Sequence, residues 1–188
     1  MTTSPRSDSW LFFGGTLSLD FVNTMRDRAT TPRETLLSAA GLQAWVEQAE
    51  LIPADNQGAG SSESVPDDLY VQALELREAI DAVLSPESTA QPSHAVVVNR
   101  WARLTPRPQL QEAAPRTVVS DPLTLAEALG AIAADAITVV TKGEQVKICA
   151  HQRCGLRFLD RSRARKRQWC SMQRCGNRTK VARHTARR

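Results

Sequence analysis

What the sequence lacks restricts what the chain can be. No apolar run reaches the ~20 residues that a membrane-spanning helix needs. The apolar stretch from Trp10 to Phe13 is far shorter than the core of a signal peptide. The motifs GxxxxGK[ST], GxGxxG, GxSxG and HExxH, which mark common nucleotide-binding and hydrolytic sites, do not occur. We therefore expect a cytoplasmic protein that is not an enzyme and does not bind a membrane.

Cysteine is absent from the first 148 residues, and the four cysteines follow with the spacing C-x4-C-x15-C-x4-C. In a cytoplasmic protein, paired cysteines indicate a metal site rather than disulfides. Four thiolates suit the tetrahedral coordination of a structural Zn²⁺, and a segment this short needs such a ligand to be stable. The alternative is four buried free thiols. We predict one structural zinc ion bound by Cys149, Cys154, Cys170 and Cys175.

Acidic residues are scarce in the same region. From Lys142 to Arg188, fifteen Lys and Arg residues accompany only Glu144 and Asp160, a net charge of +13. The first 141 residues carry nine basic and 18 acidic residues, a net charge of −9. Such a division indicates two units with different partners. We expect an N-terminal domain over residues 1–141 and a zinc finger over residues 142–188 that is attracted to polyanions.

The elements around the cysteines follow from local pattern. Residues 146–150 and 155–160 alternate like short strands, and the basic stretch 161–167 is expected to be a loop. A helix is expected to begin between Ser171 and Asn177, because both residues are good N-caps. A hairpin followed by a helix that carries the last ligands near its start is the treble-clef arrangement.

The final helix is expected to carry one basic face. Lys180, Arg183, His184 and Arg187 are offset by three, four and seven residues and therefore share one side. The opposite side, with Val181, is expected to pack on the hairpin. This face and the loop predict a polyanion site, and the alternative is a solvated charged helix. Expected phosphate contacts are Arg163, Arg165, Arg167, Lys180, Arg183 and Arg187. Expected base contacts are Asn177, Arg178 and His184, although Asn177 could instead serve only as a helix cap.

Residues 149–184, CAHQRCGLRFLDRSRARKRQWCSMQRCGNRTKVARH, resemble the CGNR zinc finger, which is named for the run at Cys175-Gly176-Asn177-Arg178. Upstream, GGTLSLDFVNT (residues 14–24) and ALELREAI (residues 73–80) are similar to the ABATE domain, which precedes this finger in bacterial proteins. The resemblance implies a treble-clef finger with the four cysteines as ligands, binding to double-stranded DNA and a role in stress-related transcription. It also implies that the N-terminal domain binds a small ligand.

The N-terminal domain is expected to be α+β, dominated by helices and with one small β-hairpin over residues 108–120. Apolar residues recur at helical spacing in several segments. Helices are expected near residues 38–49, at residues 69–83, at residues 93–104 with Ser93 as N-cap, and after Asp121-Pro122 to residue 139. Residues 17–25 fit a strand or a helix, and we favour a helix. Residues 53–68 are expected to form a loop.

Few residues of the N-terminal domain suggest chemistry. Asp20, Asn23 and Arg77 lie in the stretches that carry the resemblance. An Asp/Arg pair can bind a small polar ligand, and on this hypothesis the two residues lie together beneath a pocket. The alternative is a buried structural ion pair with Asn23 as a helix cap.

The leading interpretation is a DNA-binding transcription regulator whose N-terminal domain is a sensor or a unit that forms a homodimer. A module that binds RNA or the ribosome is second, because a zinc-stabilised basic helix does not distinguish the two kinds of duplex. A treble-clef nuclease is third. It would use His151, His184 and Asn177 with a second metal, but Asp160 is the finger's only carboxylate besides the remote Glu144.

Overall fold

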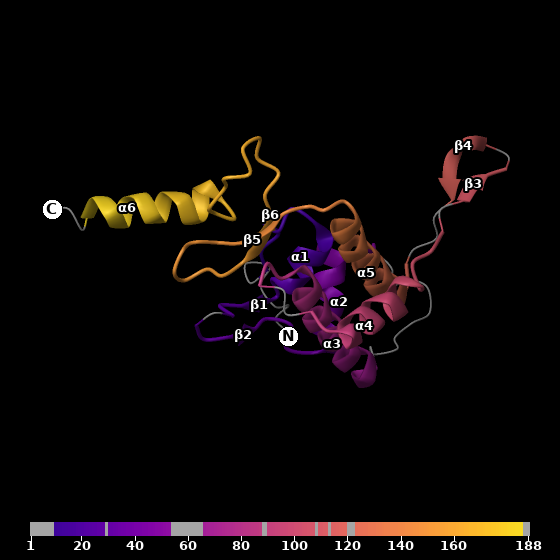
Figure 1. Ribbon diagram of the computed structural model, residues 1–188. Helices are drawn as coiled ribbons and strands as arrows, with labels where there is room; N and C mark the ends of the chain where they lie inside the picture. Colours follow the sequence, from indigo (N-terminus) through magenta and orange to yellow (C-terminus); the bar gives the residue numbers. More distant parts are fainter. Residues whose placement is uncertain are drawn as a thin grey trace.

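Helices dominate the computed structural model, which describes residues 10–28, 30–53, 66–87, 90–107, 109–112, 114–119 and 123–185 (Figure 1). The N-terminal part contains the helices α1 (Leu17–Val22), α2 (Ala39–Gln48), α3 (Asp67–Leu84), α4 (Pro92–Ala102) and α5 (Leu125–Thr141). It also contains two antiparallel hairpins, β1 (Met25–Arg26) with β2 (Arg33–Glu34) and β3 (Gln109–Gln111) with β4 (Ala114–Val119). The expected α+β class with a helix-dominated N-terminal part is confirmed.

Helix α5 is the centre of the N-terminal part and packs against α1, α2, α3 and α4. Its expected apolar stripe is buried at Leu129, Ile132, Ala136 and Val139. The core also contains Trp45 of α2, whose ring lies 5.2 Å from that of Phe21 in α1. No helix in the described part of the chain is long and apolar enough to cross a membrane.

Two helix starts differ from the sequence-based expectation. Helix α4 is capped by Gln91 and not by Ser93, because Pro92 takes the first helical position and the His94 side chain completes a capping box. Helix α5 is capped by Thr124, whose hydroxyl accepts a hydrogen bond from the backbone of Glu127. The expected cap at residues 121–122 lies outside the described residues. Residues 54–65 of the expected loop, which was predicted over residues 53–68, also lie outside them.

The first element is a helix, as favoured, but it is shorter than its apolar pattern suggested. Helix α1 ends at Val22, and Met25 belongs to strand β1 instead of to a third helical turn. The expected hairpin between α4 and α5 is confirmed as β3 and β4, which stand clear of the helices in Figure 1.

The finger unit, defined as residues 142–188, begins in a turn after α5. It contains the antiparallel strands β5 (Val146–Ile148) and β6 (Arg157–Leu159), the π-helical turn η3 (Met172–Gly176) and helix α6 (Asn177–Thr185). Strand β6 packs against α1, whereas α6 extends away from the rest of the molecule (Figure 1). The expectation that α6 packs on the hairpin is wrong, since Val181 is 66 % exposed. Its apolar side is too small to compensate for burying the charged neighbours.

Candidate metal centre and nucleic-acid interface

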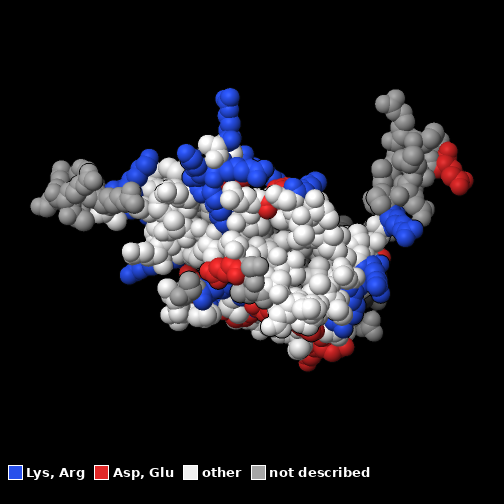
Figure 2. Space-filling view, in the orientation of Figure 1, with Lys and Arg blue, Asp and Glu red and all other residues white. Residues whose placement is uncertain are grey.

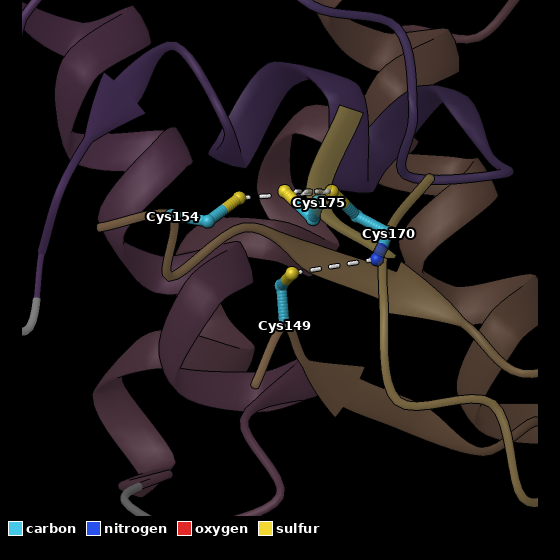
Figure 3. Close-up of side chains that lie close together, drawn as sticks. All are labelled: Cys149, Cys154, Cys170 and Cys175. Atoms are coloured by element: carbon cyan, nitrogen blue, oxygen red, sulfur yellow. Dashed lines mark hydrogen bonds between the residues drawn. The ribbon is translucent and has the colours of Figure 1, made fainter. Parts of the chain in front are cut away.

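The four cysteines converge, as predicted, into one buried cluster (Figure 3). Their sulfur atoms all lie within 4.8 Å of one another. The Sγ atom of Cys170 is 3.6 Å from that of Cys154 and 3.8 Å from that of Cys175. Zinc–sulfur bonds of about 2.3 Å at tetrahedral angles place sulfur atoms about 3.8 Å apart. The cluster therefore has the donor set and the dimensions of a site for one Zn²⁺.

Backbone turns and hydrogen bonds near the cysteines place their side chains at the metal site. Cys149 directly follows β5, and a turn at Gly155, with φ of 62° in the left-handed region, leads from Cys154 into β6. The backbone N–H of Cys170 donates to the Sγ atom of Cys149 at 3.4 Å. Such N–H···S bonds stabilise thiolate charge. Directly before η3, the hydroxyl of Ser171 accepts a hydrogen bond from the backbone N–H of Arg174, so Ser171 is the N-cap of the final helical segment, within the predicted range.

The glycine of the CGNR run is buried and closely packed. A Cβ atom at Gly176 would lie 2.6 Å from the Sδ atom of Met172 and 3.2 Å from the ring of Trp169. Both distances are shorter than ordinary contacts, so a larger residue would require the flexible, exposed Met172 side chain to move aside and the Trp169 ring to shift by a few tenths of an ångström. The asparagine of the run, Asn177, is exposed at the start of α6. It is the C-cap residue of η3, whereas the N-cap is Ser171.

Contacts within the cluster shift the pKa values of three of the cysteines in different directions. Hydrogen bonds from the Cys154 and Cys170 thiols hold the pKa of Cys149 below its usual range. The hydrogen bond that Cys149 accepts raises the pKa of Cys170, and burial raises that of Cys175 to about 12. One thiolate therefore suppresses the ionisation of its neighbours. A divalent cation removes this repulsion and lets all four act as ligands.

Strand β6 joins the finger unit to the N-terminal part. The side-chain amide of Asn23 donates to the carbonyl oxygen of Arg157 at 2.9 Å, and its oxygen accepts from the Arg157 backbone N–H at 2.8 Å. The Arg157 guanidinium binds both carboxylate oxygens of Asp81 at 2.9 and 3.2 Å. The backbone N–H of Leu159 donates to the Gly14 carbonyl oxygen at 2.8 Å. We call this set of contacts the β6 seam.

The carboxylate of Asp160 organises the basic loop, defined as residues 161–167. It accepts hydrogen bonds from the Lys147 ammonium at 2.6 Å, from the Ser162 hydroxyl and backbone, and from the Arg167 backbone at 2.9 Å. Burial acts to raise the pKa of Asp160, but the bonds from Lys147, Ser162 and Arg167 outweigh it and hold the pKa well below its usual range. Sequence reasoning noted Asp160 only as a scarce carboxylate and missed this structural role.

Arg167, expected on a phosphate, is used inside the finger unit. Its guanidinium lies 4.9 Å from the ring centroid of Phe158, within the range of a cation–π contact. It also donates to the carbonyl oxygens of Trp169, at 2.7 Å, and Cys170. These contacts connect the basic loop to the third cysteine.

Other basic residues of the loop are available to a partner. Arg163, Arg165 and Lys166 are exposed, and their side chains form no hydrogen bond or ion pair within the described part of the chain. Three expected contacts on α6 also have exposed side chains: Asn177, Arg178 and Lys180. Arg187 and the side chains of Arg183 and His184 lie outside what the structure describes.

The expected pair of Asp20 and Arg77 does not form. The buried Arg77 guanidinium binds both carboxylate oxygens of Glu34 at 2.7 Å and one of Glu78 at 2.9 Å. Asp20 instead accepts the backbone N–H of Gly14 at 2.7 Å. Since Asn23 belongs to the β6 seam, all three residues have partners inside the protein. This agrees with a structural role for Arg77, although its partner is not the one expected.

Replacing one cysteine should remove the metal. We expect about one zinc per wild-type chain and none in Cys170→Ser, measured by elemental analysis after dialysis. Helices α1 to α5 should persist in circular dichroism, because their core is separate from the cysteine cluster. The melting temperature should fall, because Leu159 of the finger unit is part of that core. Thr185→Ala, at an exposed position of α6, is the control. A Cys170→Ser chain that retains one zinc would refute the site.

Asp20 should give the protein a pH-dependent stability. Burial and the nearby Asp135 charge raise the pKa of Asp20 to about 7, although the Gly14 N–H opposes them. Ionisation is thus less favourable in the folded than in the unfolded state, and stability should fall as the pH rises from about 4 to 7. Asp20→Asn should lessen that fall, measured by urea unfolding at pH 5 and pH 8. Parallel pH profiles for the two chains would contradict the assignment.

Two family models match the chain and together cover the described helices and the cysteine cluster. Residues 15–143 match the ABATE family, described as "Putative stress-induced transcription regulator", and residues 145–188 match the CGNR zinc finger. A search of curated proteins finds no match to the chain. The first match covers most of the chain and the second contains all four cysteines. The chain therefore belongs to the ABATE family and carries a CGNR zinc finger.

Proposed function

We propose that the protein is a transcription regulator that binds double-stranded DNA through the basic loop and α6 of its finger unit. The observation that carries this proposal is an exposed basic loop whose two ends, at Ser162 and Arg167, are hydrogen-bonded to the buried Asp160. Phosphate contacts supply most of the sequence-independent affinity for DNA. A loop that is already ordered loses less conformational entropy on binding than a flexible arm.

The charge distribution supports an extended polyanion site. Lys and Arg side chains gather above β5 and β6 and beside α6, and a second group lies at the lower right near α4 and α5 (Figure 2). An open depression of about 620 Å³ lies between strand β5 and residues 165–168, and Pro86 and Glu87 also line it. Arg165 and Lys166 on one side of this depression are exposed and could contact a phosphodiester backbone.

Helix α6 provides the element that could enter a major groove. It projects from the molecule (Figure 1), and its described side chains are mostly exposed. A major groove about 12 Å wide admits one α-helix. We propose phosphate contacts from Lys180, Arg183 and Arg187 and base contacts from Asn177, Arg178 or His184. In the loop we retain Arg163 and Arg165, add Lys166 and omit Arg167, whose guanidinium is bonded within the finger unit.

The carboxylates of the finger unit do not favour a nuclease. Asp160 is buried in the base of the basic loop, and Glu144 binds the Arg161 guanidinium at 2.9 and 3.1 Å. A second, catalytic metal would need such a carboxylate as a ligand. We assign no ligand to the N-terminal part, because Asp20, Asn23 and Arg77 all serve the fold.

Charge-matched variants test DNA binding. The triple variant Arg163→Ala, Arg165→Ala, Lys166→Ala should weaken binding to all duplex sequences to a similar extent. Its plot of log affinity against log salt should be flatter by roughly one unit for each phosphate that the variant no longer binds. The control removes three exposed charges from the N-terminal part with Arg100→Ala, Arg103→Ala and Arg107→Ala, and should bind within about twofold of wild type. Fluorescence anisotropy with a labelled duplex measures both.

The same titrations discriminate between the alternatives. Equal losses in the two triple variants would mean that net charge alone drives binding and would overturn the proposed interface. Tighter binding to duplex RNA than to DNA at the same salt concentration would favour the RNA-binding alternative. Arg178→Ala should cost about 1–3 kcal/mol on a preferred site and little on other sequences if this residue reads a base.

A further inference from the structure

Helix α3 carries one exposed stripe, which we call the acidic stripe. Its residues recur at intervals of four and are Asp67, Val71 and Glu75. Residues four apart lie on the same side of a helix, so the two carboxylates and the valine between them share one surface. The side of α3 that includes Leu76 and Ile80 is buried in the core.

Helix α4 and the turn after it carry a second exposed stripe, the basic stripe, which consists of Val96, Arg100 and Leu104. The backbone N–H of Leu104 donates to a carbonyl oxygen in the last turn of α4 at 2.9 Å, so the chain keeps its helical path to this residue. Arg103 and Arg107, which follow Arg100 in the chain, are also exposed. This end of α4 is therefore a basic region on a mainly acidic part of the chain.

The two stripes also contain exposed apolar side chains. Val71 is 63 % exposed, Val96 66 % and Leu104 45 %. Single exposed apolar residues are common on protein surfaces, whereas several on one surface with polar residues around them mark a site of interaction. The stripes therefore have the composition of a contact surface, with apolar groups between charges.

An ion pair shows how the stripes lie relative to each other. Helices α3 and α4 pack together, and the Arg100 guanidinium lies 3.7 Å from a carboxylate oxygen of Glu75. Glu75 lies nine residues before the end of α3 and Arg100 eight residues after the start of α4, so the short connection makes the helices run in opposite directions. Four residues along a helix span about 6 Å. Val71 and Leu104 are therefore level with each other, one turn from the ion pair.

This arrangement makes the surface complementary to itself. A rotation by 180° about an axis that runs between α3 and α4, parallel to both, places the acidic stripe of a second copy over the basic stripe of the first. Glu75 of each copy then faces Arg100 of the other, and Val71 faces Leu104, because the members of each pair are level. Matching of one surface with itself in this way is what a closed two-fold dimer requires.

We propose that the acidic and basic stripes form the interface of a homodimer with this two-fold axis, so that a second copy of the chain covers both. The stripes lie far from α6 (Figure 1), and the dimer leaves both finger units accessible. The inference does not rest on the proposed function. On a duplex long enough for only one finger unit, the dimer adds no second DNA contact, so DNA affinity and dimerisation are separate measurements.

Sedimentation velocity of the zinc-loaded full chain over a range of concentrations tests the interface. Wild type should sediment as a reversible dimer that weakens as salt screens the charges. Arg100→Glu and Glu75→Arg each bring like charges together and should raise the dissociation constant at least about tenfold. Val71→Asp should also weaken the dimer. The matched controls Arg33→Glu and Val140→Asp change exposed residues outside the stripes and should dimerise like wild type.

A mixture of Arg100→Glu and Glu75→Arg tests the proposed axis. One variant then has two carboxylates and the other two guanidinium groups at the contact, so every pair in a mixed dimer is again of opposite charge. The equimolar mixture should dimerise with nearly wild-type affinity although neither variant does so alone, and this result would also show that both variants are folded.

Several outcomes would overturn the proposal. They are a wild-type chain that stays monomeric, an open polymer in place of a dimer, equal weakening in the two controls, and a mixture that stays monomeric although circular dichroism shows both variants to be helical. If either charge variant does not fold, Val71→Asp decides. A folded Val71→Asp chain that dimerises like wild type overturns the interface, and a weakened dimer supports it.

Discussion

Strand β6 is the element on which the rest of the structure depends, because it is buried on both faces. Leu159 belongs to the core of the N-terminal helices, whereas the adjacent Phe158 belongs to the cluster that contains the four cysteines. Side chains alternate along a strand, so three residues are enough to enter both cores. The bidentate bonds of Asn23 to Arg157 fix the register of this contact, since a slip by one residue would exchange the two faces.

The same strand also positions the surface that we propose for DNA. Asp160 follows β6 directly and orders the basic loop, and Arg167 at the end of that loop contacts Phe158 and bonds to the carbonyl of Cys170. The zinc site then fixes the start of η3, from which α6 extends. The residues that pack in the core, bind the metal and carry the exposed charges thus follow one another along one stretch of the chain.

Patterns in the local sequence predicted the features of the structure that depend mainly on neighbouring residues. The zinc ligands followed from spacing, and strands β5 and β6 from alternation, because neither depends on distant partners. The partners of Arg77, Asp160 and Asn23 depend on which segments meet in the folded chain, so sequence reasoning could not identify them. It offered Asn23 either a ligand site or a helix cap. Asn23 is the C-cap of α1, and its amide also forms the β6 seam, which the sequence did not predict. Glu34, eleven residues after Asn23, is the partner of Arg77 because the β1–β2 hairpin returns the chain.

Centrally, we claim that the β6 seam holds the N-terminal helices and the zinc centre as one rigid body. Nitrogen-15 relaxation of the zinc-loaded chain measures this most directly, because each backbone amide reports the rotational correlation time of the body to which it belongs. We predict one overall correlation time for amides of α1 to α5, β5, β6 and η3. A distinctly shorter time for β5, β6 and η3 than for α5 would show that the finger unit tumbles separately and would contradict the claim.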